Sequence, residues 1–138
     1  MRFANLVAGL LIWLATTVAA QEEPVFKDYE TMRREMDQLM VTRDIPKLML
    51  RFGGGDEMTP QQLEQLDTQV KQLFPDDFQN VAVMRKGELQ GGFHQELIAY
   101  WNGFSYIYAY VLYHQRASDV VSLNFRFNSN FSSLNSLF

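Results

Sequence analysis

Apolar residues recur at two spacings along this chain, every third or fourth position in the first half and every second position in the second half. The first spacing, between about residues 28 and 74, is typical of amphipathic helices, and the second, between about 80 and 130, is typical of strands. Helices followed by strands with short connections predict an α+β fold. We expect N-terminal helices packed on one face of a four-stranded antiparallel meander.

Three helices are predicted from their start signals. Asp28, Asp44 and Thr59 each stand where a helix is expected to begin, and their side chains can accept hydrogen bonds from N–H groups of the first turn. Pro46 suits the first turn of the second helix, and Gln62 completes a capping box with Thr59. The first helix carries a stripe that we interpret as facing the core, formed by Tyr29, Met32, Met36, Leu39 and Met40.

The dipeptide Asn102-Gly103, between two strand-like runs, predicts a β-hairpin with a two-residue turn. Because side chains alternate along a strand, this hairpin has an aromatic face and a mainly aliphatic face. The aromatic face carries Trp101, Phe104, Tyr106, Tyr108 and Tyr110. A last strand joined by an even-numbered loop adds Phe125 and Phe127 to it, so we expect the helices to cover this aromatic face.

Residues 1–20 have the pattern of a cleaved signal peptide. Arg2 precedes an apolar run, and Val18 and Ala20 stand at the positions that a signal peptidase reads. We expect cleavage after Ala20, a single domain over residues 21–138, and an exported protein, periplasmic or secreted. The apolar run is short for a bilayer, so no membrane span is expected after cleavage.

Composition excludes several kinds of chemistry. The sequence has no cysteine, which excludes disulfides, thiol catalysis and zinc–thiolate sites. A net charge of −4 without a basic patch argues against nucleic-acid binding. Gly53-Gly54-Gly55 follows a predicted helix instead of opening one, so it predicts a helix end and not a phosphate site. Asp76-Asp77 has no third ligand nearby, and neither a metal nor a cofactor is expected.

Candidate acid–base groups do not converge in the predicted register. His94 and Glu96 lie on the face opposite the tyrosines, and His114 lies near a strand end. These positions favour a non-enzymatic role without deciding the question, because no set of residues meets the requirements of acid–base catalysis.

The layout resembles the cystatin-like roll of the nuclear transport factor two-like superfamily, in its small exported members. The resemblance lies in the helix order, in the short second helix after Arg43-Asp44-Ile45-Pro46, and in the long central strands. The superfamily includes dehydratases, ketosteroid isomerases, lipid-pocket proteins and dimerisation modules, so the resemblance implies a fold and not one function.

Two hypotheses remain open. The first is an interaction module of the cell envelope that forms a homodimer through the uncovered face, with the residues 129–138 as an alternative cover of that face. Its interface would comprise Glu96, Ile98, Tyr100, Ile107, Ala109, Val111, Tyr113 and Arg126. The second is a protein that binds a small apolar ligand, or acts on it as an isomerase or dehydratase would. Its pocket would be lined by Leu66, Val70, Tyr106, Tyr108 and Tyr110.

Overall fold

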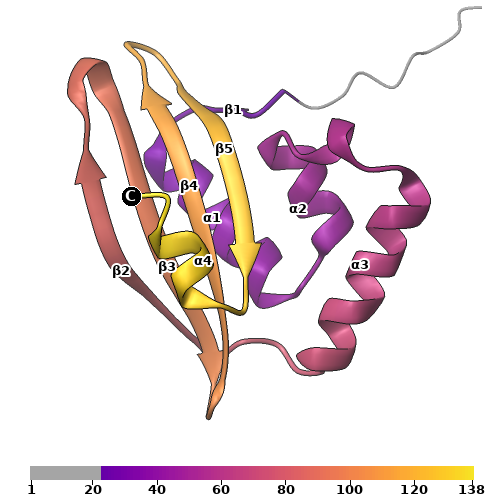
Figure 1. Ribbon diagram of the computed structural model, residues 1–138. Helices are drawn as coiled ribbons and strands as arrows, with labels where there is room; N and C mark the ends of the chain where they lie inside the picture. The colour runs from indigo at the N-terminus through magenta and orange to yellow at the C-terminus, as the bar shows by residue number, and fades with distance from the viewer. Residues whose placement is uncertain (1–22) are drawn as a thin grey trace, which may run out of the picture.

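A five-stranded antiparallel sheet is the centre of the fold in the computed structural model, which describes residues 23–138 (Figure 1). The strand order is β1-β5-β4-β3-β2, so β1 and β2 are edges and the sheet is open. The strands are β1 (Val25–Phe26), β2 (Asn80–Glu88), β3 (Phe93–Asn102), β4 (Ser105–Gln115) and β5 (Val120–Asn128). The α+β class is confirmed, and the expected four strands become five because β1 precedes the first helix. The expected signal peptide lies outside the described residues.

Helices lie on both sides of this sheet (Figure 1). On one side α1 and α2 contact the sheet and α3 packs on α2, while α4 lies on the other side near the end of the chain. The helices are α1 (Tyr29–Val41), α2 (Ile45–Phe52), α3 (Pro60–Leu73) and α4 (Phe131–Asn135), with short 3₁₀ turns at Gly55–Glu57 and Gln90–Gly92.

The predicted helix starts are confirmed. Asp28 accepts a hydrogen bond from the N–H of Thr31, and the capping box of Thr59 and Gln62 is formed in both directions. The second helix ends at Gly53, whose φ of 93° is a left-handed conformation that glycine adopts without strain. Local capping chemistry therefore determines where these helices begin and end.

The central hairpin turns one residue later than expected. Asn102 pairs with Ser105, so Gly103 and Phe104 form the turn and Trp101 pairs with Tyr106. Positive φ at Gly103 alone is the pattern of a type II′ turn. A shift of the pairing by two residues keeps each side chain on its face, so the predicted division into two faces survives.

A β-bulge in β5 overturns the expected alternation of the last strand. Tyr113 pairs with Ser122 and Leu112 pairs with Asn124, which leaves Leu123 as an extra residue. One inserted residue moves every following side chain to the other face. Phe125 and Phe127 therefore face α1 and α2, and not the tyrosines as expected.

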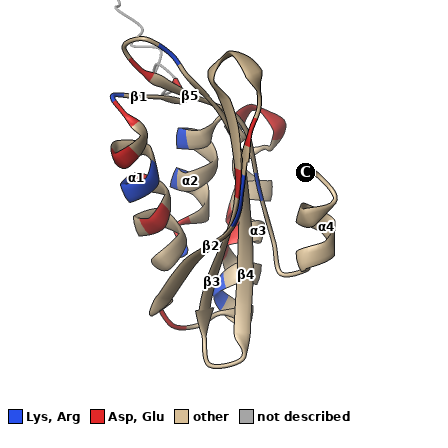
Figure 2. Cartoon of the chain, turned by 90° about the vertical axis from the view of Figure 1, so that its left-hand side faces the viewer, with Lys and Arg blue, Asp and Glu red and all other residues tan. Residues whose placement is uncertain are grey.

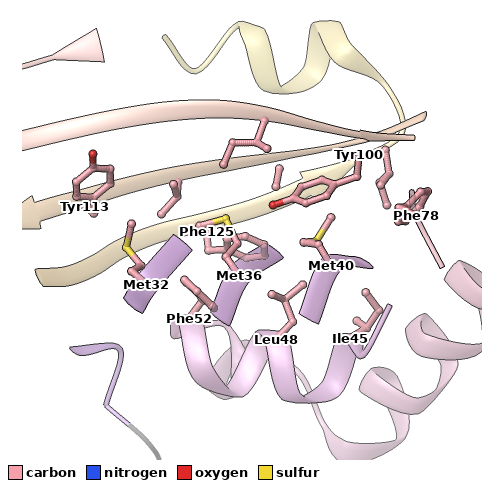
Figure 3. Close-up of a cluster of buried hydrophobic side chains, with 14 of the residues drawn as sticks. Met32, Met36, Met40, Ile45, Leu48, Phe52, Phe78, Tyr100, Tyr113 and Phe125 are labelled. Atoms are coloured by element: carbon pink, nitrogen blue, oxygen red, sulfur yellow. The ribbon is translucent and has the colours of Figure 1, made fainter. Parts of the chain in front are cut away.

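The helices cover the face opposite to the one expected (Figure 3). Met32, Met36 and Met40 of α1 pack against a buried aliphatic surface of the sheet that includes Ile98 and Ala109. The polar groups on this surface find partners on α1, because Glu96 accepts a hydrogen bond from Arg33 and the hydroxyl of Tyr100 donates to Asp37. Flexible methionine side chains fill the space between helix and strands.

The end of the chain covers part of the aromatic face. Leu134 of α4 is buried against Leu97 and Tyr110, and Phe138 packs edge-on against Tyr110. The residues 129–138 thus fold back on the sheet, as one alternative predicted, but on the face opposite to the one considered (Figure 1).

Candidate functional site

A cluster of polar side chains lies buried between α1 and β3. Glu96 Oε1 accepts hydrogen bonds from the hydroxyl of Tyr29 at 2.8 Å and from Nη1 of Arg33 at 3.1 Å. Arg33 Nη1 also donates to the Tyr29 hydroxyl at 3.0 Å. The Glu96 side chain is 2% exposed and that of Arg33 is 14% exposed, so this is a desolvated ion pair. Figure 2 shows both basic and acidic positions along α1, the helix that carries Arg33.

Asp37 extends this cluster by one helical turn. It accepts hydrogen bonds from Nη2 of Arg33 at 3.2 Å and from the hydroxyl of Tyr100 at 2.7 Å. Burial, and then the charge and hydrogen bond of Asp37, raise the pKa of Tyr100 well above its usual value. The pKa of Tyr113 is also raised, first by burial and then by Glu96. The hydroxyl groups of Tyr100 and Tyr113 therefore keep their protons at neutral pH.

The charged groups of the cluster are paired with one another, and one guanidinium with two carboxylates leaves a net charge of −1. Arg33 contacts both carboxylates, and both tyrosine hydroxyls donate to carboxylate oxygens. Only two buried atoms of the cluster have no hydrogen-bond partner in the described part of the chain, Nε of Arg33 and Oε2 of Glu96. The cluster consequently holds α1 against the sheet, and it presents no free base beside a free acid.

The two histidines lie on opposite faces, as predicted. His94 pairs with Tyr113 and stacks on its ring at 5.3 Å, whereas His114 pairs with Phe93 and stacks at 4.0 Å. His114 Nε2 also contacts the carbonyl oxygen of Gly91 at 3.0 Å. No pair of imidazoles is available for shared proton transfer.

The five predicted pocket residues do not form one pocket. Val70 is buried in the core on the helix side of the sheet, and Leu66 borders a groove described below. The three tyrosines, Tyr106, Tyr108 and Tyr110, lie on the opposite side, where α4 covers part of the sheet. The prediction was wrong because it assigned the helices to the aromatic face.

The predicted dimer interface is the hydrophobic core. Its apolar members are covered by the helices of the same chain and are at most 7% exposed: Ile98, Tyr100, Ile107, Ala109, Val111 and Tyr113. Glu96 pairs with Arg33 and not with Arg126, which the bulge moves to the other face beside Tyr110. The homodimer interface is thus corrected to an intramolecular contact.

A groove of about 560 Å³ runs along β5 between α3 and α4, which lie on either side of that strand (Figure 1). Its apolar lining comes from Met49, Leu66, Phe125, Phe127, Leu134 and Leu137. Its polar lining comes from Glu57, Asn124, Arg126, Asn128 and Ser133. Five consecutive residues of β5 line it, so the groove follows the edge of the strand and not one face.

This edge of β5 is paired only at its beginning. β1 pairs with Val120 and Val121, and the N–H of Ser122 donates to the carbonyl oxygen of Pro24 at 2.9 Å. Beyond Ser122, within residues 23–138, no strand pairs with β5 on the side away from β4. The groove therefore contains an open sheet edge.

Few residues of the buried cluster or of the groove are predictable from the sequence. Tyr29, Arg33 and Asp37 recur every fourth position on α1, a spacing that places them on one helix face beside the methionines. That spacing was the available signal for the buried cluster. No local signal marked the groove, because it depends on the bulge at Leu123 and on the position of α4.

Neither a metal site nor a membrane-spanning helix is found in the part of the chain that the structure describes. No three His, Asp or Glu side chains among residues 23–138 are grouped so that they could hold a metal ion. None of the described helices has the length and apolar character needed to cross a bilayer.

No protein family, curated protein or solved structure matches this chain.

Proposed function

We propose that the protein is an exported, non-enzymatic binding module of the cell envelope, and that the groove along β5 is its binding surface. The observation that carries this proposal is the open edge of β5 between α3 and α4. Exposed strand edges are usually shortened, charged or covered in folded proteins, and this one lies instead at the base of a preformed groove.

Two further features support the proposal. The groups that could perform acid–base chemistry, Glu96, Asp37 and the tyrosines beside them, are engaged with Arg33 and with one another. The sequence pattern of residues 1–20 supports export. The order of helices and strands is also compatible with the cystatin-like roll, whose members include interaction modules, and this likeness rests on layout alone.

Site-specific photocrosslinking in the source cell tests the proposal. A photoreactive amino acid at Asn128, an exposed amide in the groove, is compared with the same amino acid at Gln69, an exposed amide of α3 outside it. We expect a discrete adduct from position 128 only, on protein that begins at Gln21 and is recovered outside the cytoplasm.

The adduct should disappear when Leu66→Arg introduces a charge into the groove wall. Equal adducts from both positions, or an adduct that survives Leu66→Arg in folded protein, would contradict binding in the groove. Recovery of the intact chain in the cytoplasm would contradict export.

A further inference from the structure

We infer that the groove binds an extended segment of a partner protein as an added β-strand, alternately apolar and polar, with a carboxylate facing Arg126. This inference rests on the proposed function and names the ligand of the same groove. Adding a strand to a sheet edge is a recurring mode of peptide recognition, in which backbone hydrogen bonds give affinity and alternate side chains give specificity.

The register shows which backbone groups of β5 face the groove. The hairpin closes on Asn102 and Ser105, so every second pair from there exchanges hydrogen bonds between β3 and β4, including Ile98 with Ala109 and Glu96 with Val111. The backbone groups of Ala109 and Val111 therefore point away from β5.

Phe127 and Phe125 are their partners on β5, so the backbone groups of these two phenylalanines point toward the open edge. They are spaced as two successive attachment points of an antiparallel or parallel strand. Ser122, which points the same way ahead of the bulge, already donates to Pro24. The added strand would thus pair with the part of the β5 edge that follows the part paired with β1.

The two walls of the groove differ in charge. On the α3 side, Met49 and Leu66 lie beside the side chains of Phe125 and Phe127, and Glu57, just before α3, is the acidic group of the lining. On the α4 side, Arg126 is exposed and forms no ion pair within the described residues, and the rest of that wall includes Ser133, Leu134 and Leu137. Because alternate side chains of a strand point to opposite faces, the ligand needs apolar residues toward α3 and an acidic residue toward α4.

The shape of the groove favours a single strand over a second copy of the chain. Leu66 of α3 and Leu134 of α4 line the groove on either side of the β5 edge, so a second folded copy would have to enter the space between these two helices to pair edge to edge. A two-fold axis at the middle of the open edge, near Arg126, would also bring two like charges together across the joined strands.

Hydrogen exchange of the mature protein with a defined peptide pool tests the inference. The pool contains ten-residue peptides in which Val, Ile, Leu or Phe alternates with Ser, Thr, Asn or Asp. We expect the pool to slow exchange at the N–H groups of Phe125 and Phe127, while the N–H of Arg126, which faces β4, serves as the internal reference.

Three matched changes distinguish backbone hydrogen bonding of an added strand from non-specific apolar binding of the peptide. N-methylation of every second peptide residue, on the side whose N–H groups face β5, should lower the affinity of the selected peptide by about tenfold or more, because each change removes a backbone hydrogen-bond donor. N-methylation of the other residues, whose N–H groups face away from β5, should leave the affinity unchanged. Arg126→Glu should weaken an Asp peptide by about twofold to fivefold. A Lys peptide should recover that loss.

Each other result overturns the inference. No peptide from the pool protecting Phe125 and Phe127, or binding insensitive to which residues are methylated, excludes strand addition. Slow exchange of these two N–H groups in the dilute protein alone indicates that the chain's own residues occupy the edge, and protection that rises with protein concentration indicates a second copy. If the crosslink from position 128 persists in these cases, the groove still binds a partner and only the mode is wrong.

Discussion

Arg33 on α1 lies with its Nη1 atom 3.1 Å from Oε1 of Glu96 on β3, so the first helix is fastened to the sheet by a desolvated ion pair. The two residues are far apart in sequence, and neither charge has bulk water to stabilise it. Such a pair contributes little relative to an apolar replacement of both residues, but removing one partner alone is costly.

Arg33→Met should therefore lower the free energy of unfolding by about 3–5 kcal/mol, because the carboxylate of Glu96 is left buried without its counter-charge. Urea denaturation followed by circular dichroism measures this change. Arg34→Met, an exposed position next to it, should change stability by less than about 0.5 kcal/mol. The double variant Arg33→Met with Glu96→Leu should be more stable than Arg33→Met alone, and equal or lower stability would contradict this account.

Stability should fall at alkaline pH because of the buried phenols. Burial beside Asp37 raises the pKa of Tyr100 well above its unfolded value of about 10, and the pKa of Tyr113 is raised as well. Below pH 10 both phenols are protonated in the folded and the unfolded chain, so their contribution to the free energy of unfolding is fully present. Above pH 10 the unfolded chain loses protons that the native chain keeps, so stability declines with increasing pH.

Tyr100→Phe should make this decline shallower, as measured by urea unfolding between pH 8 and 11. In a pH titration, the absorbance of the phenolate should appear at a higher pH in the native protein than in the denatured one. Tyr106→Phe, at a 39% exposed position, serves as the control. An unchanged slope for Tyr100→Phe would show that its proton is not held by the native structure.

Leu134→Ala should lower the free energy of unfolding by about 2–4 kcal/mol, because Leu134 is 3% exposed and fills the space over Leu97 and Tyr110. Thermal unfolding and chemical denaturation both report the change. Leu137→Ala, at a 39% exposed position on the same tail, should cost less than about 1 kcal/mol. Equal effects of the two substitutions would contradict the burial of Leu134 of α4 against the aromatic face.

Ile107→Asp should unfold the chain and not merely alter its oligomeric state. Ile107 is 2% exposed and lies beneath the helices, so a carboxylate there would be buried without a partner. Loss of the native circular dichroism spectrum is the expected result, and Val83→Asp on the exposed part of β2 should leave it intact. A folded Ile107→Asp protein with a reduced mass in sedimentation would restore the dimer hypothesis.

Local signals in the sequence were sufficient for the helix boundaries and for the two faces of the central hairpin. Capping at Asp28, Asp44 and Thr59 depends on residues within one turn, and the alternation of side chains tolerates a turn that shifts by one residue. These features depend on contacts between neighbours in sequence, which is why they could be predicted.

Two features escaped prediction because they are set by tertiary contacts. The bulge at Leu123 has no marker in the sequence, yet it reverses the orientation of Phe125 and Arg126 and so decides what lines the groove. The prediction of the covered face was wrong because the aromatic content of a sheet face does not by itself determine which face the helices bury. The methionine stripe of α1 instead matched the aliphatic face, and Arg33 of that helix found Glu96 there.

The buried methionines of α1 also affect how the protein reacts with oxidants. Thioether sulfur is the readily oxidised side-chain group in a chain without cysteine, and each sulfoxide would place a polar, chiral oxygen where an apolar contact existed. Met32, Met36 and Met40 are at most 1% exposed, whereas Met84 on β2 is 47% exposed. Peroxide should therefore convert Met84 to its sulfoxide first, and oxygen appearing on the three buried sulfurs would record how often α1 lifts from the sheet.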